Sequence, residues 1–211
     1  VLASQIFGLN PDPKVTMTLN GNSYSPQSQE HAISAGVFMC PKDRASNAVV
    51  SEFDISNNLA LPFFKRHSRL SFIRNKSLTQ NARNSINELG IVCQSEMDSV
   101  TTLSGGNQQK VMVGRWLAED SSVLLLDEPF QGVDIKARRD IGHQIRSTSR
   151  QRATIIFVAE LDEALEIADR VIVLHEGNLV GDYQNKSKNI PKIVSSFSGS
   201  ANNLDSANYG T

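Results

Sequence analysis

The sequence predicts an α/β fold in which parallel strands are flanked by helices. Two short apolar runs, residues 123–126 and 153–158, have the length and composition of buried parallel strands. Segments with helical periodicity, residues 106–119 and 135–150, lie before and after the first of these runs, as expected when helices cover a parallel sheet. The 211 residues, 39% of them hydrophobic and 20% charged, suffice for one domain with a sizeable core.

Composition and charge argue against several classes of protein. The net charge of −1 gives no electrostatic case for binding nucleic acid. Cys40 and Cys93 have neither metal-ligand spacing nor a disulfide framework, which suits a reducing cytosol. No segment approaches the length of a transmembrane helix, and no signal peptide is visible. We therefore expect any membrane association to come through a partner.

The first 44 residues predict the end of a helix, a hairpin strand and a short parallel strand. Residues 1–8 resemble the last turns of a helix that Gly8 terminates. Residues 14–19 alternate in polarity and an Asn-Gly pair follows them, which predicts an edge hairpin. Residues 36–40 are apolar and lead into a charged loop at 41–44.

A helical region follows, from about residue 50 to residue 102. Its periodicity is irregular, and residues 77–89 form its clearest amphipathic segment. Phe63 and Phe64 allow two interpretations, of which a place in the hydrophobic core is favoured over contact with a partner.

Residues 103–110 read Leu-Ser-Gly-Gly-Asn-Gln-Gln-Lys and open the helix at 106–119. A turn of this kind at a helix N-terminus presents backbone N–H groups and the positive end of the helix dipole, which suits a phosphate. Taken alone, Ser104-Gly105-Gly106 is also compatible with an ordinary turn. Farther along the helix, we expect Trp116 to pack against the sheet rather than on an adenine. Gly114 costs about 1 kcal/mol relative to alanine and has no functional reason in the sequence.

The apolar strand at residues 123–126 runs directly into two carboxylates, Asp127 and Glu128. Such a pair offers one oxygen ligand for Mg²⁺ and one base that orients a water molecule. The ordinary alternative for Glu128 is a strand-end acid that faces solvent. Asp134 suits the N-cap of the helix at 135–150. Together, the Ser-Gly-Gly turn and the carboxylates predict a protein that handles the terminal phosphate of a nucleotide.

These motifs resemble those of the ATP-binding cassette (ABC) ATPases. Residues 103–109 match the family's signature sequence, and residues 123–128 match its Walker B strand. The ending at 106–110 is similar to that of the importers for ribose, galactosides and xylose, whose ATP-binding proteins carry two ATPase domains. This chain is most similar to the second. The resemblance covers residues 1–183 and implies a P-loop NTPase-type core with a helical subdomain at 50–102 and a small antiparallel sheet.

The resemblance also implies roles for individual residues. Asp127 would hold Mg²⁺ through a water molecule, and Glu128 would polarise the water that attacks ATP. The remaining positions would bind ATP across the interface between two ATPase domains, Asp134 as part of the D-loop; they are Ser104, Gly105, Gly106, Gln108 and Asp134. The implied partners are a second ABC ATPase domain, transmembrane permease subunits and, indirectly, a sugar-binding protein. The implied location is the cytoplasmic face of the membrane.

The chain departs from the family pattern at three places. The sequence contains no Gly-x-x-x-x-Gly-Lys-Ser/Thr phosphate loop and resembles a cassette from just downstream of that loop. The family resemblance implies that the upstream loop is degraded, with an Arg in place of its Lys. Lys42 replaces an acidic residue of the sugar importers. Ala159 occupies the place of the switch histidine, and the histidines present, His31, His67, His143 and His175, lie elsewhere. We therefore predict an asymmetric pair, in which this domain completes its partner's site while its own is slow or silent.

The leading functional prediction is the ATP-binding subunit of a sugar importer. The alternative is a catalytically silent pseudo-ATPase domain that donates its signature loop or senses nucleotide. A relative in DNA repair or translation is disfavoured, because the sequence has no coiled-coil insertion, zinc-type cysteine pairing or basic face. The Asn- and Ser-rich residues 184–211 predict a mobile tail, with at most a short amphipathic turn around residues 190–197.

Overall fold

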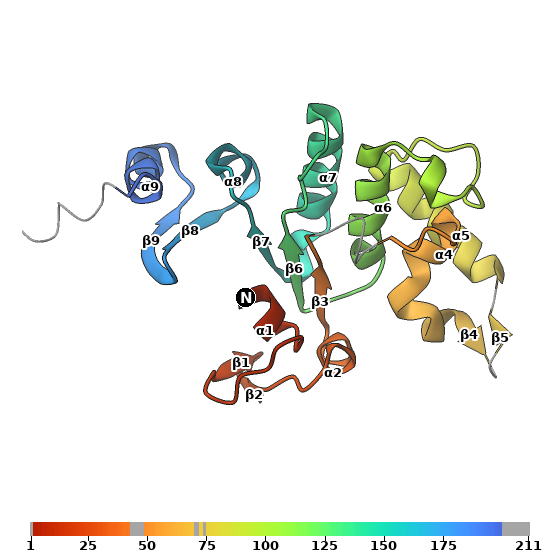
Figure 1. The fold of residues 1–211 in the computed structure, drawn as a ribbon, viewed down its shortest axis with the longest axis horizontal. Helices are drawn as coiled ribbons and strands as arrows, with labels where there is room; N and C mark the ends of the chain where they lie inside the picture. The colour runs from red at the N-terminus through yellow and green to blue at the C-terminus, as the bar shows by residue number, and fades with distance from the viewer. Residues whose placement is uncertain (1, 43–48, 70–71, 74, 200–211) are drawn as a thin grey trace, which may run out of the picture. The chain divides into compact units, whose positions relative to one another are not determined.

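A computed structural model describes residues 2–42, 49–69, 72–73 and 75–199 (Figure 1). The chain forms two compact units that divide between Phe157 and Val158, and each is described here by itself. The predicted α/β class is confirmed: a parallel sheet, helices and small antiparallel sheets are all present. Within the described ranges, no helix has the length and apolar character that crossing a bilayer requires.

A three-stranded parallel sheet lies at the centre of the first unit. Its order is β3-β6-β7, with Val37 beside Val123 and Val123 beside Ala153. Strands β3 and β6 are buried, whereas Ala153 and Ile155 of β7 are exposed. The prediction of a buried strand at 153–158 is thus only half right, because β7 is the end strand of this sheet. The strands are β3 (Val37–Cys40), β6 (Val123–Asp127) and β7 (Ala153–Phe157).

The N-terminal segment folds into a short helix that ends before Gly8 and into the predicted hairpin. Gly8 has a φ of 73°, and a Cβ there would lie 2.8 Å from the Ser28 carbonyl oxygen, so only glycine fits. Asn20 and Gly21 both have positive φ, as a tight hairpin turn requires. The Tyr24 hydroxyl donates a 2.9 Å hydrogen bond to the Ile6 carbonyl. The elements are α1 (Leu2–Ile6), β1 (Met17–Leu19), β2 (Asn22–Tyr24) and α2 (Gln29–Ser34).

The helical region has a hydrophobic core of its own. Ile55, Leu89 and Val100 are almost fully buried there, together with Val111 of the helix that follows. Phe63 is 3% exposed and packs against Phe38 of β3, as the core interpretation predicts. A two-stranded hairpin within this region was not predicted. The elements are α4 (Ile55–Ala60), η1 (Leu61–His67), β4 (Ser68–Arg69), β5 (Phe72–Ile73), α5 (Asn75–Leu89) and η2 (Val100–Thr102).

Two long helices, α6 (Gly105–Leu117) and α7 (Ile135–Ser147), complete the first unit, followed by η3 (Ser149–Gln151). In Figure 1, α6 lies beside α4 and α5 and contacts β3 and α7. Trp116 is 6% exposed and packs edge-on against Phe7 and Phe63, and tilted against Phe38 of the sheet, which confirms the prediction for its ring.

Gly114 has a packing role that the sequence did not reveal. A Cβ at this position would lie 2.5 Å from Leu89 Cδ1 and 3.3 Å from Leu59 Cδ2. Because contacts below 3 Å require something to move, only glycine lets α6 approach α4 and α5 this closely. The cost of a glycine inside a helix is therefore offset by close helix packing.

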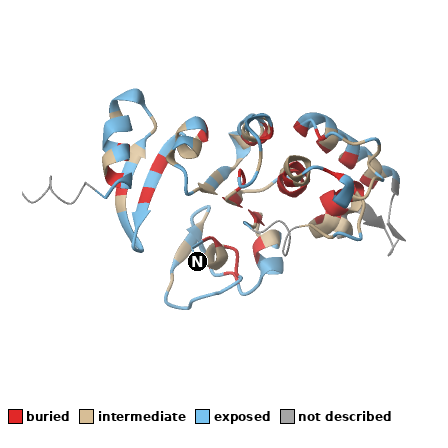
Figure 2. Ribbon diagram, turned by 45° about the horizontal axis from the view of Figure 1, so that its top comes forward, coloured by how far each residue is buried: buried red, intermediate tan, exposed pale blue. Residues whose placement is uncertain are grey.

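The second unit is a hairpin covered by helices. Strands β8 and β9 pair antiparallel. Buried and exposed residues alternate along β8 (Figure 2), because one face packs on Ile193 of α9 and the other is open within this unit. His175 is exposed beside the hairpin turn. The elements are α8 (Leu161–Ile167), β8 (Arg170–His175), β9 (Asn178–Gln184), η4 (Ser187–Asn189) and α9 (Ile190–Phe197).

Part of the predicted tail differs from the expectation. Residues 190–197 form α9, whose Ile193 is fully buried against β8 and β9. The Tyr183 hydroxyl and the Ser196 hydroxyl form a 2.9 Å hydrogen bond, which fixes the helix to the hairpin. The composition alone could not reveal these contacts, since they depend on the hairpin. Residues 200–211 lie outside the described part of the chain.

Candidate functional site

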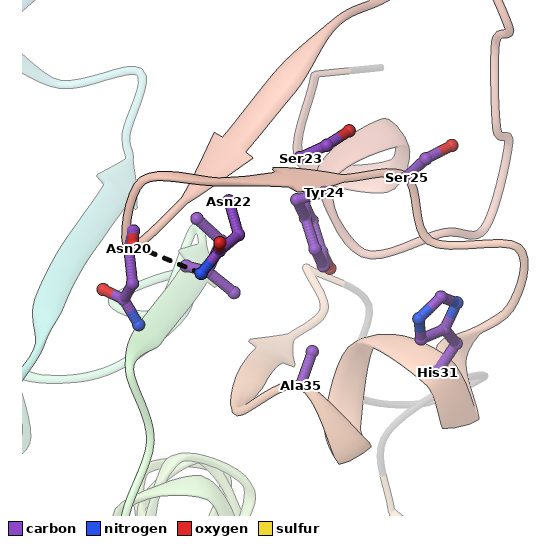
Figure 3. Close-up of a pocket in the computed structure, with 8 residues that line it drawn as sticks. Asn20, Asn22, Ser23, Tyr24, Ser25, His31 and Ala35 are labelled. Atoms are coloured by element: carbon purple, nitrogen blue, oxygen red, sulfur yellow. Dashed lines mark hydrogen bonds between the residues drawn. The ribbon is translucent and has the colours of Figure 1, made fainter.

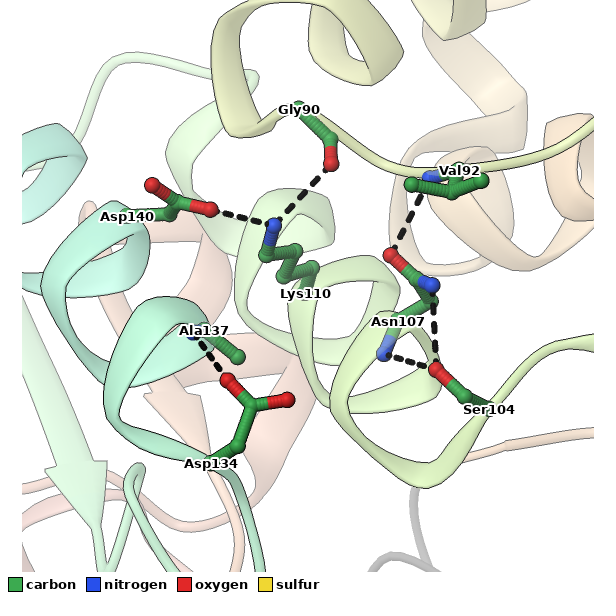
Figure 4. A network of polar contacts seen from close by, with 8 residues as sticks. All are labelled: Gly90, Val92, Ser104, Asn107, Lys110, Asp134, Ala137 and Asp140. Atoms are coloured by element: carbon green, nitrogen blue, oxygen red, sulfur yellow. Dashed lines mark hydrogen bonds and ion pairs between the residues drawn. The ribbon is translucent and has the colours of Figure 1, made fainter.

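The Ser-Gly-Gly turn is an exposed N-cap. Ser104 precedes α6, and its hydroxyl accepts a 3.4 Å hydrogen bond from the Asn107 backbone N–H and a 3.0 Å bond from the Asn107 side-chain amide (Figure 4). The Asn107 side-chain oxygen accepts in turn from the Val92 backbone N–H at 3.0 Å. Hydrogen bonds through Asn107 therefore fix the turn to the domain, while Ser104 itself faces solvent at the positive end of the α6 dipole.

Gly105 and Gly106 form the first turn of α6, as the motif predicts. A Cβ at Gly106 would lie 3.2 Å from the Ala137 Cβ and 3.9 Å from the Asp134 carboxylate. The absence of a side chain thus lets the start of α6 approach the start of α7. This packing brings the signature turn and the Asp134 loop together.

Asp134 is the N-cap of α7, as predicted. Its carboxylate accepts a 2.8 Å hydrogen bond from the Ala137 backbone N–H. Asp134 itself is exposed. The N-cap geometry is compatible with a second role at an interface, because one carboxylate oxygen suffices for the cap.

Gln108, a predicted nucleotide contact, makes hydrogen bonds within its own domain. Its side-chain amide donates to the carbonyls of Val100 and Leu103, at 3.3 and 3.2 Å. Both amide hydrogens are therefore committed to the loop that precedes Ser104. In this structure, Gln108 holds the turn that presents Ser104, and its own amide nitrogen points back into the domain.

Asp127 and Glu128 lie at the carboxyl end of β6 and are half-buried. Asp127 is the last residue of the strand, in register with Phe157 of β7. Glu128 has a φ of 51°, a left-handed conformation that is uncommon for a residue other than glycine. Its backbone N–H donates to the Phe157 carbonyl at 2.9 Å, so the chain leaves the sheet abruptly at this residue.

Two buried polar residues of α6 were not singled out by the sequence. Gln109, 1% exposed, donates a 2.8 Å hydrogen bond to the Pro129 carbonyl, directly after Glu128. Lys110, 4% exposed, contacts the Gly90 carbonyl at 3.0 Å and the Asp140 carboxylate at 2.7 Å, which joins α6 to the end of α5 and to α7 (Figure 4). The signal available in the sequence was that these two polar residues occupy positions on the buried side of α6.

A third buried polar residue, Arg115, joins α6 to α4. Its guanidinium donates to the Asn58 carbonyl at 2.6 Å and to the Asn58 side-chain oxygen at 3.3 Å. Burial lowers the pKa of Arg115 to about 10. The Asn58 amide also bonds the loop at 50–54, so α6 and this loop share one hydrogen-bonded centre.

The positions that depart from the family pattern are ordinary in structure. Ala159 comes two residues after β7 and is exposed, with a methyl side chain that cannot donate a hydrogen bond. Lys42 is exposed, and Asp43 and Arg44 lie outside the described residues. His31 and His143 are exposed surface residues on α2 and α7.

A separate polar hollow of about 490 Å³ lies beside the β1–β2 hairpin and α2 (Figure 3). Tyr24 and His31 contribute to its lining along with uncharged asparagines and serines. Among the described residues, no carboxylate, lysine or arginine lines it, and no predicted site residue lies there. The hollow therefore plays no part in the candidate site.

Comparison with solved structures defines the class of protein. The ATP-binding cassette MJ1267 matches with a TM-score of 0.74 over 93% of this chain and 82% of that chain, at 18% identity. A dimeric, post-hydrolysis structure of the cassette MJ0796 bound to ADP and Pi matches with a TM-score of 0.71 over 88% of this chain and 80% of that chain, at 14% identity. The fold is thus that of an ATP-binding cassette.

The family model described as "ABC transporter" matches residues 1–131, and the chain belongs to this family. Among its relatives, the xylose import ATP-binding protein XylG of Thermoanaerobacter pseudethanolicus is 34% identical over 92% of this chain. The arabinose import ATP-binding protein AraG of Pectobacterium atrosepticum is 33% identical over the same share. The chain spans only 39% of the length of either relative.

Proposed function

We propose that this chain is the second ATP-binding cassette of a sugar importer and couples the binding and hydrolysis of ATP to solute uptake. The relatives named above are import ATP-binding proteins, and this chain matches 39% of their length, a share that suits one of two cassettes. The observation that carries the proposal is one compact unit that bears both an exposed Ser104 turn and a pair of strand-end carboxylates.

The Ser104 turn would serve a nucleotide held by a companion cassette. In a head-to-tail pair, the phosphate loop of one cassette faces the signature turn of the other. The Ser104 hydroxyl and the first turn of α6, at Gly105 and Gly106, would then bind the terminal phosphate, because a helix N-terminus attracts anions. Asp134 would help to set the spacing across the interface.

The carboxylates would serve the cassette's own nucleotide. Magnesium usually takes one or two carboxylates, phosphate oxygens and several waters, and it neutralises phosphate charge when bound. Asp127 would take that role through a water molecule, from its place at the end of β6. Glu128 would orient the attacking water.

The proposed pair is asymmetric. Ala159 cannot donate a hydrogen bond to a γ-phosphate, so the chain's own site would turn over slowly or not at all. The companion site would be completed by the intact Ser104 turn. The other partners in this proposal are permease subunits, which would hold the protein at the cytoplasmic face of the membrane, and a sugar-binding protein that acts through them.

The testing experiment is a calorimetric titration of Mg-ATP into the chain, alone and mixed with a companion cassette. The companion has an intact phosphate loop and a disabled signature, so it cannot hydrolyse ATP without a donor. We expect no binding to the chain alone and restored hydrolysis in the mixture. A mixture that stays inactive would favour the alternative, a silent domain that senses nucleotide or supports structure.

A further inference from the structure

The backbone of Glu128 is held in a conformation that it would not adopt unaided. Its φ of 51° lies in the left-handed region, which a residue with a side chain occupies only where its surroundings compensate for the strain. Two contacts hold its own peptide groups: Glu128 N–H donates to the Phe157 carbonyl at 2.9 Å, and Gln131 N–H donates to the Glu128 carbonyl at 3.1 Å. The first contact comes from β7 of the sheet, and the second comes from the turn itself.

A third contact comes from another part of the fold. The side-chain amide of Gln109 donates a 2.8 Å hydrogen bond to the carbonyl of Pro129, the residue directly after Glu128. Gln109 is 1% exposed, and Pro129 is buried as well. Proline has no backbone N–H and a fixed φ, so this carbonyl is the single backbone group through which its peptide is anchored. In a buried setting of low dielectric such a bond is stronger than it is in water.

Gln109 lies on α6, five residues after Ser104 at the exposed end of the same helix. The position of α6 is in turn fixed by Lys110, which bonds α5 and α7, and by Arg115, which bonds Asn58 of α4. The helix therefore connects the surface proposed to meet a companion cassette with the peptide that follows Glu128.

We propose that Gln109 is a positioning residue, which makes the orientation of Glu128 depend on the position of the signature helix. The proposal rests on the proposed function, in which Ser104 serves the companion's nucleotide and Glu128 serves the chain's own. Closure of the companion's site on the Ser104 turn would then restrain α6 and, through one hydrogen bond, Glu128. The two nucleotide sites of the pair would communicate through this bond.

The first experiment tests, in the absence of nucleotide, whether Gln109 holds the peptide at Glu128. Gln109→Met removes the donor and keeps the length of the side chain. Gln144→Met is the matched control, because Gln144 is 8% exposed and donates a similar 3.0 Å bond to Glu88, between α7 and α5. Amide hydrogen exchange in the full chain is expected to become at least tenfold faster at Glu128 and Gln131 in Gln109→Met. The control leaves these two amides unchanged after correction for global stability.

The second experiment uses a conservative variant with a pH signature. In Gln109→Glu, a protonated carboxyl can donate to the Pro129 carbonyl, whereas an ionised one cannot. In the assembled ATP-binding protein, kcat of Gln109→Glu relative to the wild type should rise as the pH falls from 8 to 6. Gln109→Met should lower kcat severalfold at every pH, by no more than Glu128→Gln does, with KM for ATP unchanged, because the Gln109 side chain is buried.

Three results would be decisive against the proposal or its premise. Unchanged exchange at Glu128 and Gln131 in Gln109→Met overturns the structural link. Faster exchange with an unchanged kcat overturns the effect on catalysis. A wild-type assembly without any ATP turnover counts against the proposed function alone, because the exchange measurement still decides whether Gln109 holds the Glu128 peptide.

Discussion

The signature turn and the strand-end carboxylates differ in how the chain builds them. The Ser104 turn is exposed, has ordinary backbone geometry and is capped by residues no more than twelve positions away, such as Asn107 and Val92. Glu128 is half-buried in a left-handed conformation, and the contacts around it come from β7 and α6 as well as from its own turn. The hydrogen bonds that cap the Ser104 turn are thus local, whereas the peptide at Glu128 is also held by distant segments.

The largest expected effect tests whether the two regions serve different nucleotides. Gly105→Asp places a carboxylate where the companion's phosphate would bind, and we expect turnover of the pair to fall about 100-fold, the scale of losing a preorganised contact to developing charge. Folding should be preserved, because an acidic residue suits the first turn of a helix. Glu128→Gln should lower steady-state ATP hydrolysis only severalfold. Equal losses in the two variants would contradict the asymmetry.

The next prediction concerns the packing of α6, the helix that joins the two regions. Gly114→Ala puts a Cβ 2.5 Å from Leu89 Cδ1, and overpacking of this kind costs about 1–3 kcal/mol, more than the roughly 1 kcal/mol that alanine adds in helix propensity. Urea unfolding should show a net destabilisation. Leu89→Ala in the same background removes the clash, so the double variant should be less destabilised than the sum of the single ones. Additive losses would count against the clash.

A pH experiment tests the burial of Cys40 in the parallel sheet that carries the carboxylates. Cys40 lies in β3, in register with Leu126 of β6. Burial raises the pKa of its thiol from near 9 to about 12. Above pH 9 the unfolded chain loses this proton while the folded chain keeps it, so stability should fall, approaching about 1.4 kcal/mol per pH unit. The Tyr24 pKa, also raised to about 12, adds to the loss only above pH 10. Urea unfolding at pH 8, 9 and 10 gives the slope.

The control for this measurement is the other cysteine. Partial burial, with help from Asp98 and Glu96, also raises the pKa of Cys93. Cys40→Ala should flatten the alkaline slope more than Cys93→Ala does, whatever each substitution costs at pH 8. A steeper residual slope in Cys40→Ala than in Cys93→Ala would show that Cys40 is not the main source.

The smallest effect concerns the strain at Glu128 itself. Glycine occupies the left-handed region without penalty, whereas other residues pay about 1–2 kcal/mol there. Glu128→Gly should therefore be about 1 kcal/mol more stable than Glu128→Gln in chemical denaturation, although both lack the carboxylate. If the glutamine variant is the more stable of the two, the contacts around this peptide do not store strain.

The difference between the two regions also explains what the sequence predicted. The N-cap at Asp134 and the tight turn at Asn20 follow from a few neighbouring residues, and both were predicted. The Gln109–Pro129 bond, the Arg115–Asn58 bond and the reason for Gly114 join segments 20 to 57 residues apart, and no local pattern contains them. The hydrogen bonds of Gln108 to the preceding loop likewise have no signal in its motif.

The packing of Trp116 has a spectroscopic consequence. It is the single tryptophan of the sequence, and its ring touches Phe7 after α1, Phe38 of β3 and Phe63 of η1. Its indole N–H is buried and meets no hydrogen-bond acceptor among the described residues. An indole in such apolar surroundings emits at short wavelength, and its emission moves to longer wavelength when water reaches it. The chain thus contains a label-free optical reporter at the junction of its N-terminal segment, its sheet and its helical region.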